Sequence, residues 1–200
     1  MINWLNNSIE KAGWLRFILW LAVNIGYSVW AFLSPGPWRN IAAATGDGAG
    51  NDLAQVPKIP EVMPGFPAGE PAASFSKMSE VIDQYILFQA IDIPYAIISM
   101  MMAIAAISIG LKRFNLSGGV KFVLFLPIIY FASELVENAL LAAMAGEYIP
   151  DDSVFVLLQQ SATTTKFVTD GLTSVAMAIS IITAIGAAFF SLFKRKKTSA

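Results

Sequence analysis

Five charged side chains interrupt stretches of the sequence that are otherwise apolar, and they are of the types that could do chemistry there. They are Asp92, Glu134, Glu137, Lys166 and Asp170. Carboxyl groups in an apolar setting can act as general acid and base, bind a cation or pair with an amine. Because a charge at the centre of a membrane-spanning helix costs about 2.5 to 3.5 kcal/mol, these side chains should face the interior of a helical bundle.

The charges of this set do not balance. Four acids and one lysine give a formal charge of −3. In an apolar interior this charge must be neutralised by protons, water, a cation or a cationic ligand. We expect Lys166 to pair with Asp170, one turn away, or with Glu137 or Asp92 on another helix. At least one carboxyl should carry a proton and donate a hydrogen bond. A metal ion is not expected, because the lysine competes for the carboxylates.

Other polar residues share the spacing and depth of these charges. They recur at intervals of three, four and seven residues, which places them on one face of each helix. At about 1.5 Å per residue, Asp92, Glu137 and Lys166 lie roughly 12 to 18 Å inside the outer ends of their helices. The predicted site, either a ligand-binding site or a buried polar network, consists of Asn24, Tyr27, Gln89, Asp92, Glu134, Glu137, Asn138, Thr163, Lys166 and Asp170.

The composition excludes most familiar cofactor and metal chemistry. The chain has no Cys and no His, so it offers no thiolate nucleophile, zinc ribbon, iron–sulfur ligand, imidazole base or haem ligand. No glycine-rich phosphate loop follows a strand-like run, and a formal net charge of −1 gives no reason to expect nucleic acid. We predict no cofactor and no metal, and the sequence assigns no residue a catalytic role.

Four long apolar stretches must position these residues. The hydrophobic content of 56% and the mean hydropathy of +0.62 are typical of a membrane protein. A helix needs about 20 mainly apolar residues to cross a hydrocarbon core roughly 30 Å thick. The stretches cover about 14–33, 82–111, 120–145 and 154–193, with a basic tail at 194–200. The sequence therefore predicts a single all-α membrane domain over 1–200, built as a four-helix transmembrane bundle.

Lys and Arg gather on one side of this arrangement. With the N-terminus inside, the inner segments hold nine basic residues and one acid, whereas the outer segments hold three basic residues and nine acids. Short loops rich in Lys and Arg stay in the cytoplasm. Both termini should therefore be cytoplasmic.

Prolines mark the connection between the first two stretches and also interrupt two of the stretches. The segment 34–80 holds seven of the ten prolines and shows little helical or strand periodicity. We expect a long Pro/Gly-rich outer loop that runs extended across the bundle. Within the stretches, Pro94 and Pro127 are placed to kink the second and third helices.

Three short motifs carry a resemblance to a known family. They are IDIPY on the second stretch, ELVEN on the third and TTTKF on the fourth. Over about residues 59–190 the chain resembles an uncharacterised family of small four-span bacterial membrane proteins with D-x-P-Y, E-x-x-E-N and T-x-x-K elements. The resemblance implies a bacterial inner membrane and one constellation, formed by Asp92, Glu137, Asn138 and Lys166, but no reaction. In helix count and intramembrane acids the chain is also similar to EXPERA-type four-helix proteins, which bind or isomerise sterols.

Two functions are open from the sequence. In the first, a hydrophobic small molecule or lipid enters between the helices and meets the polar layer, with or without acid–base catalysis, which predicts an internal cavity. In the second, the chain is an accessory or assembly subunit of a larger membrane complex, and the polar layer only holds the helices in register. We favour binding without catalysis. The expected partners are membrane lipids, and a membrane-protein partner or a second copy is the alternative.

Overall fold

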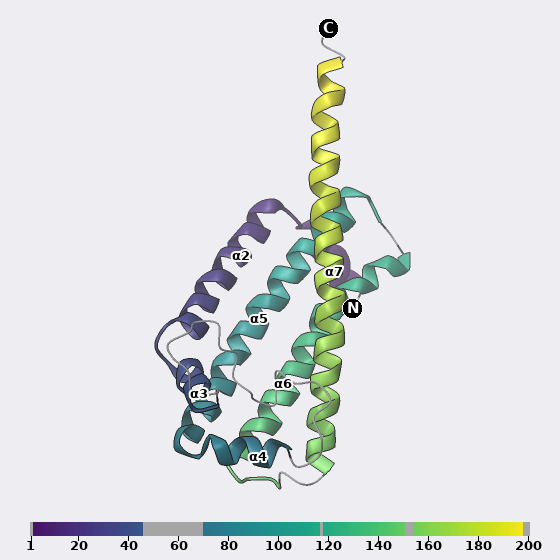
Figure 1. The fold of residues 1–200 in the computed structure, drawn as a ribbon. Helices are drawn as coiled ribbons and strands as arrows, with labels where there is room; N and C mark the ends of the chain where they lie inside the picture. Colours follow the sequence, from purple (N-terminus) through teal and green to yellow (C-terminus); the bar gives the residue numbers. More distant parts are fainter. Residues whose placement is uncertain (1, 46–69, 117, 151–153, 198–200) are drawn as a thin grey trace.

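The computed structural model describes residues 2–45, 70–116, 118–150 and 154–197 (Figure 1). In these residues every regular element is a helix, and no strand occurs. The α-helices are α1 (Ile2–Glu10), α2 (Trp14–Ser28), α3 (Pro37–Thr45), α4 (Glu70–Lys77), α5 (Ile82–Arg113), α6 (Leu126–Ala145) and α7 (Val154–Lys197). A π-helical turn covers Val29–Leu33, and 3-10 helices cover Ser79–Val81 and Gly118–Phe125.

Four helical stretches are long and apolar enough to cross a membrane. They are Trp14–Leu33, Ser79–Arg113, Gly118–Ala145 and Val154–Phe190. Each coincides within a few residues with a stretch that the sequence marks as apolar. The prediction of an all-helical chain with four helices of spanning length is confirmed.

The central helix of the bundle is α5. It packs against α2, α6 and α7, and α6 also packs along α7 (Figure 1). Because α2 lies at the edge, large apolar side chains such as Leu15, Ile18 and Leu19 remain exposed on it. In a bilayer such a surface faces lipid, where apolar exposure carries no penalty.

The first spanning stretch ends in a widened turn. The N–H of Ser34 donates to the carbonyl of Val29 at 3.0 Å, a hydrogen bond over five residues that belongs to a π-helix. The chain then turns, and α3 begins at Pro37. Proline suits a first helical position, because the N–H that it lacks would have no helical partner there.

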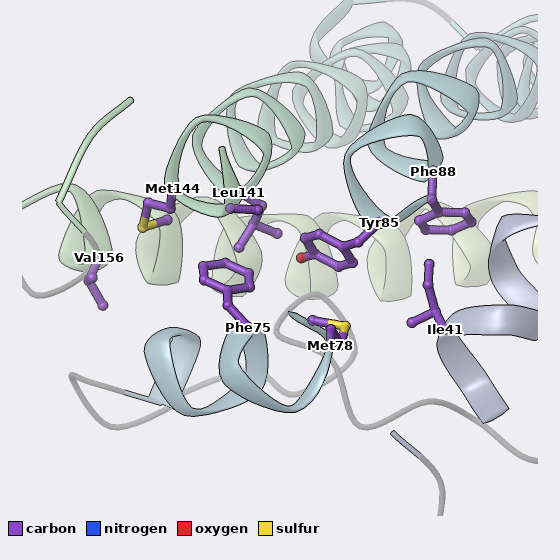
Figure 2. Packing of buried hydrophobic residues seen from close by; sticks show 9 residues of the cluster. Ile41, Phe75, Met78, Tyr85, Phe88, Leu141, Met144 and Val156 are labelled. Atoms are coloured by element: carbon purple, nitrogen blue, oxygen red, sulfur yellow. The ribbon is translucent and has the colours of Figure 1, made fainter. Parts of the chain in front are cut away.

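The expected extended loop between the first two stretches is wrong where the structure describes it. Both described parts contain a helix, α3 and α4, at the end of the bundle that is lower in Figure 1. Ile41 of α3 and Phe75 of α4 are buried with Tyr85 and Leu141 in one apolar cluster (Figure 2). Helices this short are held by packing and not by propensity. Residues 46–69 of the predicted loop lie outside the described residues.

The third spanning stretch is not one continuous α-helix. Gly118–Phe125 forms 3-10 turns, and α6 begins at Leu126, so Pro127 lies in its first turn. The first turn tolerates proline, since the missing N–H has no partner there. The expected kink of a helix interior at Pro127 is therefore wrong. Pro94 does lie inside α5.

The last helix, α7, runs past the bundle. It has 44 residues, which corresponds to about 66 Å at about 1.5 Å per residue. At the end of α5, the guanidinium of Arg113 donates to the carbonyl of Ala187 at 3.0 Å. Beyond this point α7 continues to Lys197 and projects from the bundle (Figure 1).

Helices α5 and α7 approach closely at Gly110. A Cβ at this position would lie 2.7 Å from the Cβ of Ser180. We expect Gly110→Ala to lower the free energy of unfolding by about 1 to 3 kcal/mol, the usual cost of overpacking, as measured by thermal unfolding in detergent. The control is Gly171→Ala on α7, where no described atom lies within 4 Å of the added Cβ. Equal midpoints for the two variants would contradict the close approach.

Candidate functional site

Three charged side chains are buried together between α6 and α7. Glu134 and Glu137 of α6 are 5% and 0% exposed, and Lys166 of α7 is 8% exposed. The Nζ of Lys166 forms an ion pair with Oε2 of Glu137 and lies 3.6 Å from Oε2 of Glu134. Of the partners that the sequence allows for Lys166, the structure brings Glu137 to it, and it adds Glu134.

Two further side chains of α7 hold the other carboxylate oxygen of Glu137. Thr163 Oγ1 donates to Oε1 of Glu137, and Gln159 Nε2 donates to Oγ1 of Thr163 at 2.7 Å. Gln159, Thr163 and Lys166 follow one another at intervals of four and three residues, so they share one side of the helix. Both carboxylate oxygens of Glu137 are therefore engaged by α7.

Asp92 and Asn138 tie α5 to the same layer. Asn138 Nδ2 donates to Oδ2 of Asp92 at 3.2 Å and, at 3.5 Å, to the carbonyl of Gln89. Three helices thus meet in one set of contacts, which we name the buried polar layer. Its members are Gln89, Asp92, Glu134, Glu137, Asn138, Gln159, Thr163 and Lys166.

Asp170 has a different environment, although it lies one turn from Lys166. The ion pairs of Lys166 to the glutamates direct its ammonium toward α6. The side chain of Asp170 is exposed at the surface of the protein. It lines a cavity of about 230 Å³ between α2, α5, α6 and α7. The structure thus separates Asp170 from the buried polar layer and places it at this cavity.

Several other polar groups face the cavity. Asn24, Tyr130 and Thr173 line it together with Ser99. Asn24 Nδ2 donates to Oγ of Ser99 at 2.9 Å. Thr173 is 5% exposed, and its Oγ1 has no hydrogen-bond partner among the residues that the structure describes. A buried hydroxyl without a partner is unfavourable by about 1 to 3 kcal/mol, so a hydrogen bond to Thr173 from the cavity would be stabilising.

Tyr27 lies beside the buried polar layer and supports α5. Its hydroxyl donates to the carbonyl of Ile91 at 2.6 Å, and its ring stacks on Tyr95 with centroids 6.3 Å apart. Ile91 lies in the turn before Pro94, where the helix loses a backbone donor. The contacts of Tyr27 are therefore with the backbone and an aromatic ring of α5.

The structure adds five residues to the predicted site. They are Tyr95, Ser99, Tyr130, Gln159 and Thr173. Helical spacing already places Gln159 and Thr173 on the stripe of Lys166. Tyr95 and Ser99 could have been found in the same way, since they follow Asp92 by three and seven residues. Tyr130 likewise precedes Glu134 by four. Polar uncharged side chains at helical spacing also hold membrane helices together, so spacing alone does not separate a functional residue from a packing one.

We compared the chain with protein-family models, with curated proteins and with solved structures, and none of them matches it. The resemblance to small four-span bacterial membrane proteins therefore stays a prediction. What the site can do follows from its geometry.

The buried polar layer and the cavity differ in what they can do. In the layer, charged groups contact one another within the protein and join three helices. The cavity is lined by the exposed carboxylate of Asp170 and by Thr173, whose hydroxyl has no hydrogen-bond partner among the described residues. In the described part of the chain, no three Asp or Glu residues are grouped as metal ligands. The cavity is thus the candidate for ligand recognition, and the buried polar layer is the candidate for positioning the helices.

Proposed function

We propose that this protein binds an amphiphilic small molecule or lipid within its helical bundle, with the polar group of the ligand at the cavity beside Asp170. The observation that carries the proposal is the exposed carboxylate of Asp170 at this cavity. Asp170 follows Lys166 by one helical turn, so it lies about 6 Å from the depth of the buried polar layer. A charge that faces lipid is costly. A cationic or hydrogen-bond-donating group of a ligand would remove that cost.

The cavity suits the polar part of a ligand. Its volume of about 230 Å³ equals that of roughly eight water molecules at about 30 Å³ each. Pockets for drug-sized ligands are larger, about 300 to 1,000 Å³. Asn24, Tyr130 and Thr173 add an amide, a phenol and a hydroxyl, while Met102 and Met177 give an adaptable apolar wall. The expected ligand carries a small donor-bearing head group and an apolar part that stays in the lipid.

The buried polar layer has a supporting role in this proposal. The contacts of Glu137 with Lys166 and Thr163 set the rotation of α6 against α7. That rotation determines which residues line the cavity between them. Because the carboxyl groups of the layer are engaged with neighbouring side chains, we propose binding and no acid–base step.

The test is native mass spectrometry of the protein extracted from its own membranes in mild detergent. We expect a single chain or a homo-oligomer with a defined extra mass, whose value identifies the ligand class. Asp170→Asn should lower the occupancy about tenfold or more, because a hydrogen bond to a charged group contributes about 1.5 to 3 kcal/mol. The matched control is Asp83→Asn, an exposed acid at the start of α5, which should retain the ligand.

Two results would overturn this function. The first is a stoichiometric complex with other membrane proteins and no small ligand, which would favour an accessory or assembly subunit. The second is an identical ligand occupancy in the Asp170→Asn and Asp83→Asn variants, which would place the bound molecule elsewhere.

We infer in addition that the protein is inserted in a bacterial inner membrane with both termini in the cytoplasm. The support is the gathering of bases at the α1 end of the bundle, where Lys112 donates to the carbonyls of Glu10 and Ala12 and Lys121 donates to Asn6. Bases in short segments favour the cytoplasmic side.

Because the chain has no Cys, single cysteines report the orientation directly. A membrane-impermeant maleimide applied to spheroplasts should label Glu80→Cys, which lies before α5. It should label Lys11→Cys, between α1 and α2, only after permeabilisation. The opposite pattern would reverse the orientation.

A further inference from the structure

Two hollows adjoin at the α1 end of the bundle. The first has a volume of about 460 Å³, and its polar lining comes from α1, from the last turn of α5 and from the connection between α5 and α6. These polar residues are Asn6, Glu10, Lys112, Asn115 and Lys121. Two lysines against one glutamate give this hollow a formal charge of +1.

The second hollow is apolar and has a volume of about 270 Å³. Ile107 of α5, Val120 and Val123 of the 3-10 segment, and Ile179 of α7 contribute to its walls. Leu111 and Leu116 line both hollows, so the polar hollow and the apolar one lie against the same two side chains. A cationic hollow beside an apolar one matches the chemistry of an anionic amphiphile.

The lysines are held in place for such a ligand. Lys112 Nζ donates to the carbonyls of Glu10 at 2.7 Å and Ala12 at 3.0 Å, which ties it to the end of α1. Lys121 Nζ donates to Oδ1 of Asn6 at 2.8 Å. An ammonium group has three donors, so these contacts leave capacity to bind an anion. Both lysines are thus oriented before a ligand arrives.

We propose that this pair of hollows binds one anionic phospholipid, with its phosphate head group near Lys112 and Lys121 and part of an acyl chain in the apolar hollow. Charge favours this occupant over a zwitterionic lipid. The apolar hollow favours it over free phosphate, which would leave that surface uncovered. No residue is common to this site and to the cavity of Asp170, and the acid there would repel the same head group.

The test is native mass spectrometry of the protein in neutral detergent, titrated with phosphatidylglycerol, with phosphatidylcholine of the same acyl chains or with inorganic phosphate. We expect one phosphatidylglycerol to be retained at concentrations at which phosphatidylcholine and phosphate are not. Equal retention of the two lipids would overturn the role of the lysines. Retention of inorganic phosphate to the same extent would overturn the role of the apolar hollow.

Matched variants separate this site from general attraction to the basic end. Lys121→Gln keeps an amide donor for Asn6, and it should lower phosphatidylglycerol retention about fivefold, the usual effect of one lysine at an anionic surface. Lys11→Gln removes an equal charge outside the hollow and should leave retention unchanged. Equal losses in the two variants would show nonspecific attraction and reject the site.

A second pair of variants tests the apolar hollow. Val120 and Phe122 are both 52% exposed, but only Val120 lines the hollow. Val120→Trp should fill it and lower retention severalfold, whereas Phe122→Trp should not. The same retention in both variants would reject the acyl-chain position. Since Asp170 lies outside the site, the Asp170→Asn variant should keep its phosphatidylglycerol, which makes the two proposals independent.

Discussion

Replacing Lys166 by Met is expected to lower the free energy of unfolding by about 3 to 5 kcal/mol, the usual effect of leaving a buried charge without its partner. The substitution keeps a long side chain but removes the ammonium that pairs with Glu137 and lies 3.6 Å from Glu134. For a chain of this size, such a loss lowers the unfolding midpoint by about 10 °C. The measurement is thermal unfolding in mild detergent, together with the yield of monodisperse protein.

The control for this variant is Lys77→Met at the end of α4. Lys77 is exposed, so its replacement should change the midpoint little. If the Lys166→Met protein unfolds at the same temperature as the wild type, the ion pair does not support the bundle. The buried polar layer would then lose its proposed role in setting the rotation of α6 against α7.

Replacing Glu137 and Lys166 together is expected to cost less than the two single replacements added. Glu137→Gln keeps an acceptor for Oγ1 of Thr163, but it removes one of the acids that neutralise Lys166. The double variant E137Q/K166M has neither charge of the closest pair. Neighbouring buried groups show coupling energies of about 0.5 to 3 kcal/mol, so we expect the double variant to recover at least about 1 kcal/mol.

The measurement is a double-mutant cycle of unfolding midpoints in one detergent. The control cycle combines Glu137→Gln with Lys77→Met, two changes at sites with no shared contact in the described structure, and these should add within about 0.5 kcal/mol. Additivity in both cycles would mean that Glu137 and Lys166 are energetically independent. If Lys166→Met alone gives no folded protein, a folded double variant would itself show that the two side chains are coupled.

Stability and binding should respond to different residues. Asp170→Asn removes an exposed carboxylate, so it should lower ligand occupancy with little change in the unfolding midpoint. The Glu137 and Lys166 variants should lower the midpoint first. A variant set in which both properties always fall together would mean that the cavity and the buried polar layer act as one unit.

Where the four spanning helices lie could be predicted from the sequence within a few residues. A run of about 20 apolar residues is a local property, and the bilayer length that it must match is the same for every protein. Pro35 and Pro37 likewise mark the end of the first stretch, because proline lacks the N–H that a continuing helix needs. Pro127 shows the limit of this reasoning. A proline can kink a helix or lie in its first turn. Here α6 begins only after the 3-10 turns, so Pro127 lies in the first turn of α6.

The short helices α3 and α4 could not be predicted in the same way. Their residues include Pro37, Pro71 and several small side chains, so local periodicity is weak. They are helical in contact with the bundle, where Ile41, Phe75 and Met78 are buried against α5 and α6 (Figure 2). Burial in that cluster is a property of the folded chain and not of the segment.

The residue types and the helical spacing of the polar positions predict a shared face and depth for these side chains. They left open which helix each face meets. Lys166 and Asp170 are one turn apart on one stripe, yet the first contacts α6 and the second lines a cavity. Only the packing of α6 against α7 separates them. Spacing along one helix defines the direction in which a side chain leaves the axis. A contact depends in addition on the position and rotation of the neighbouring helix.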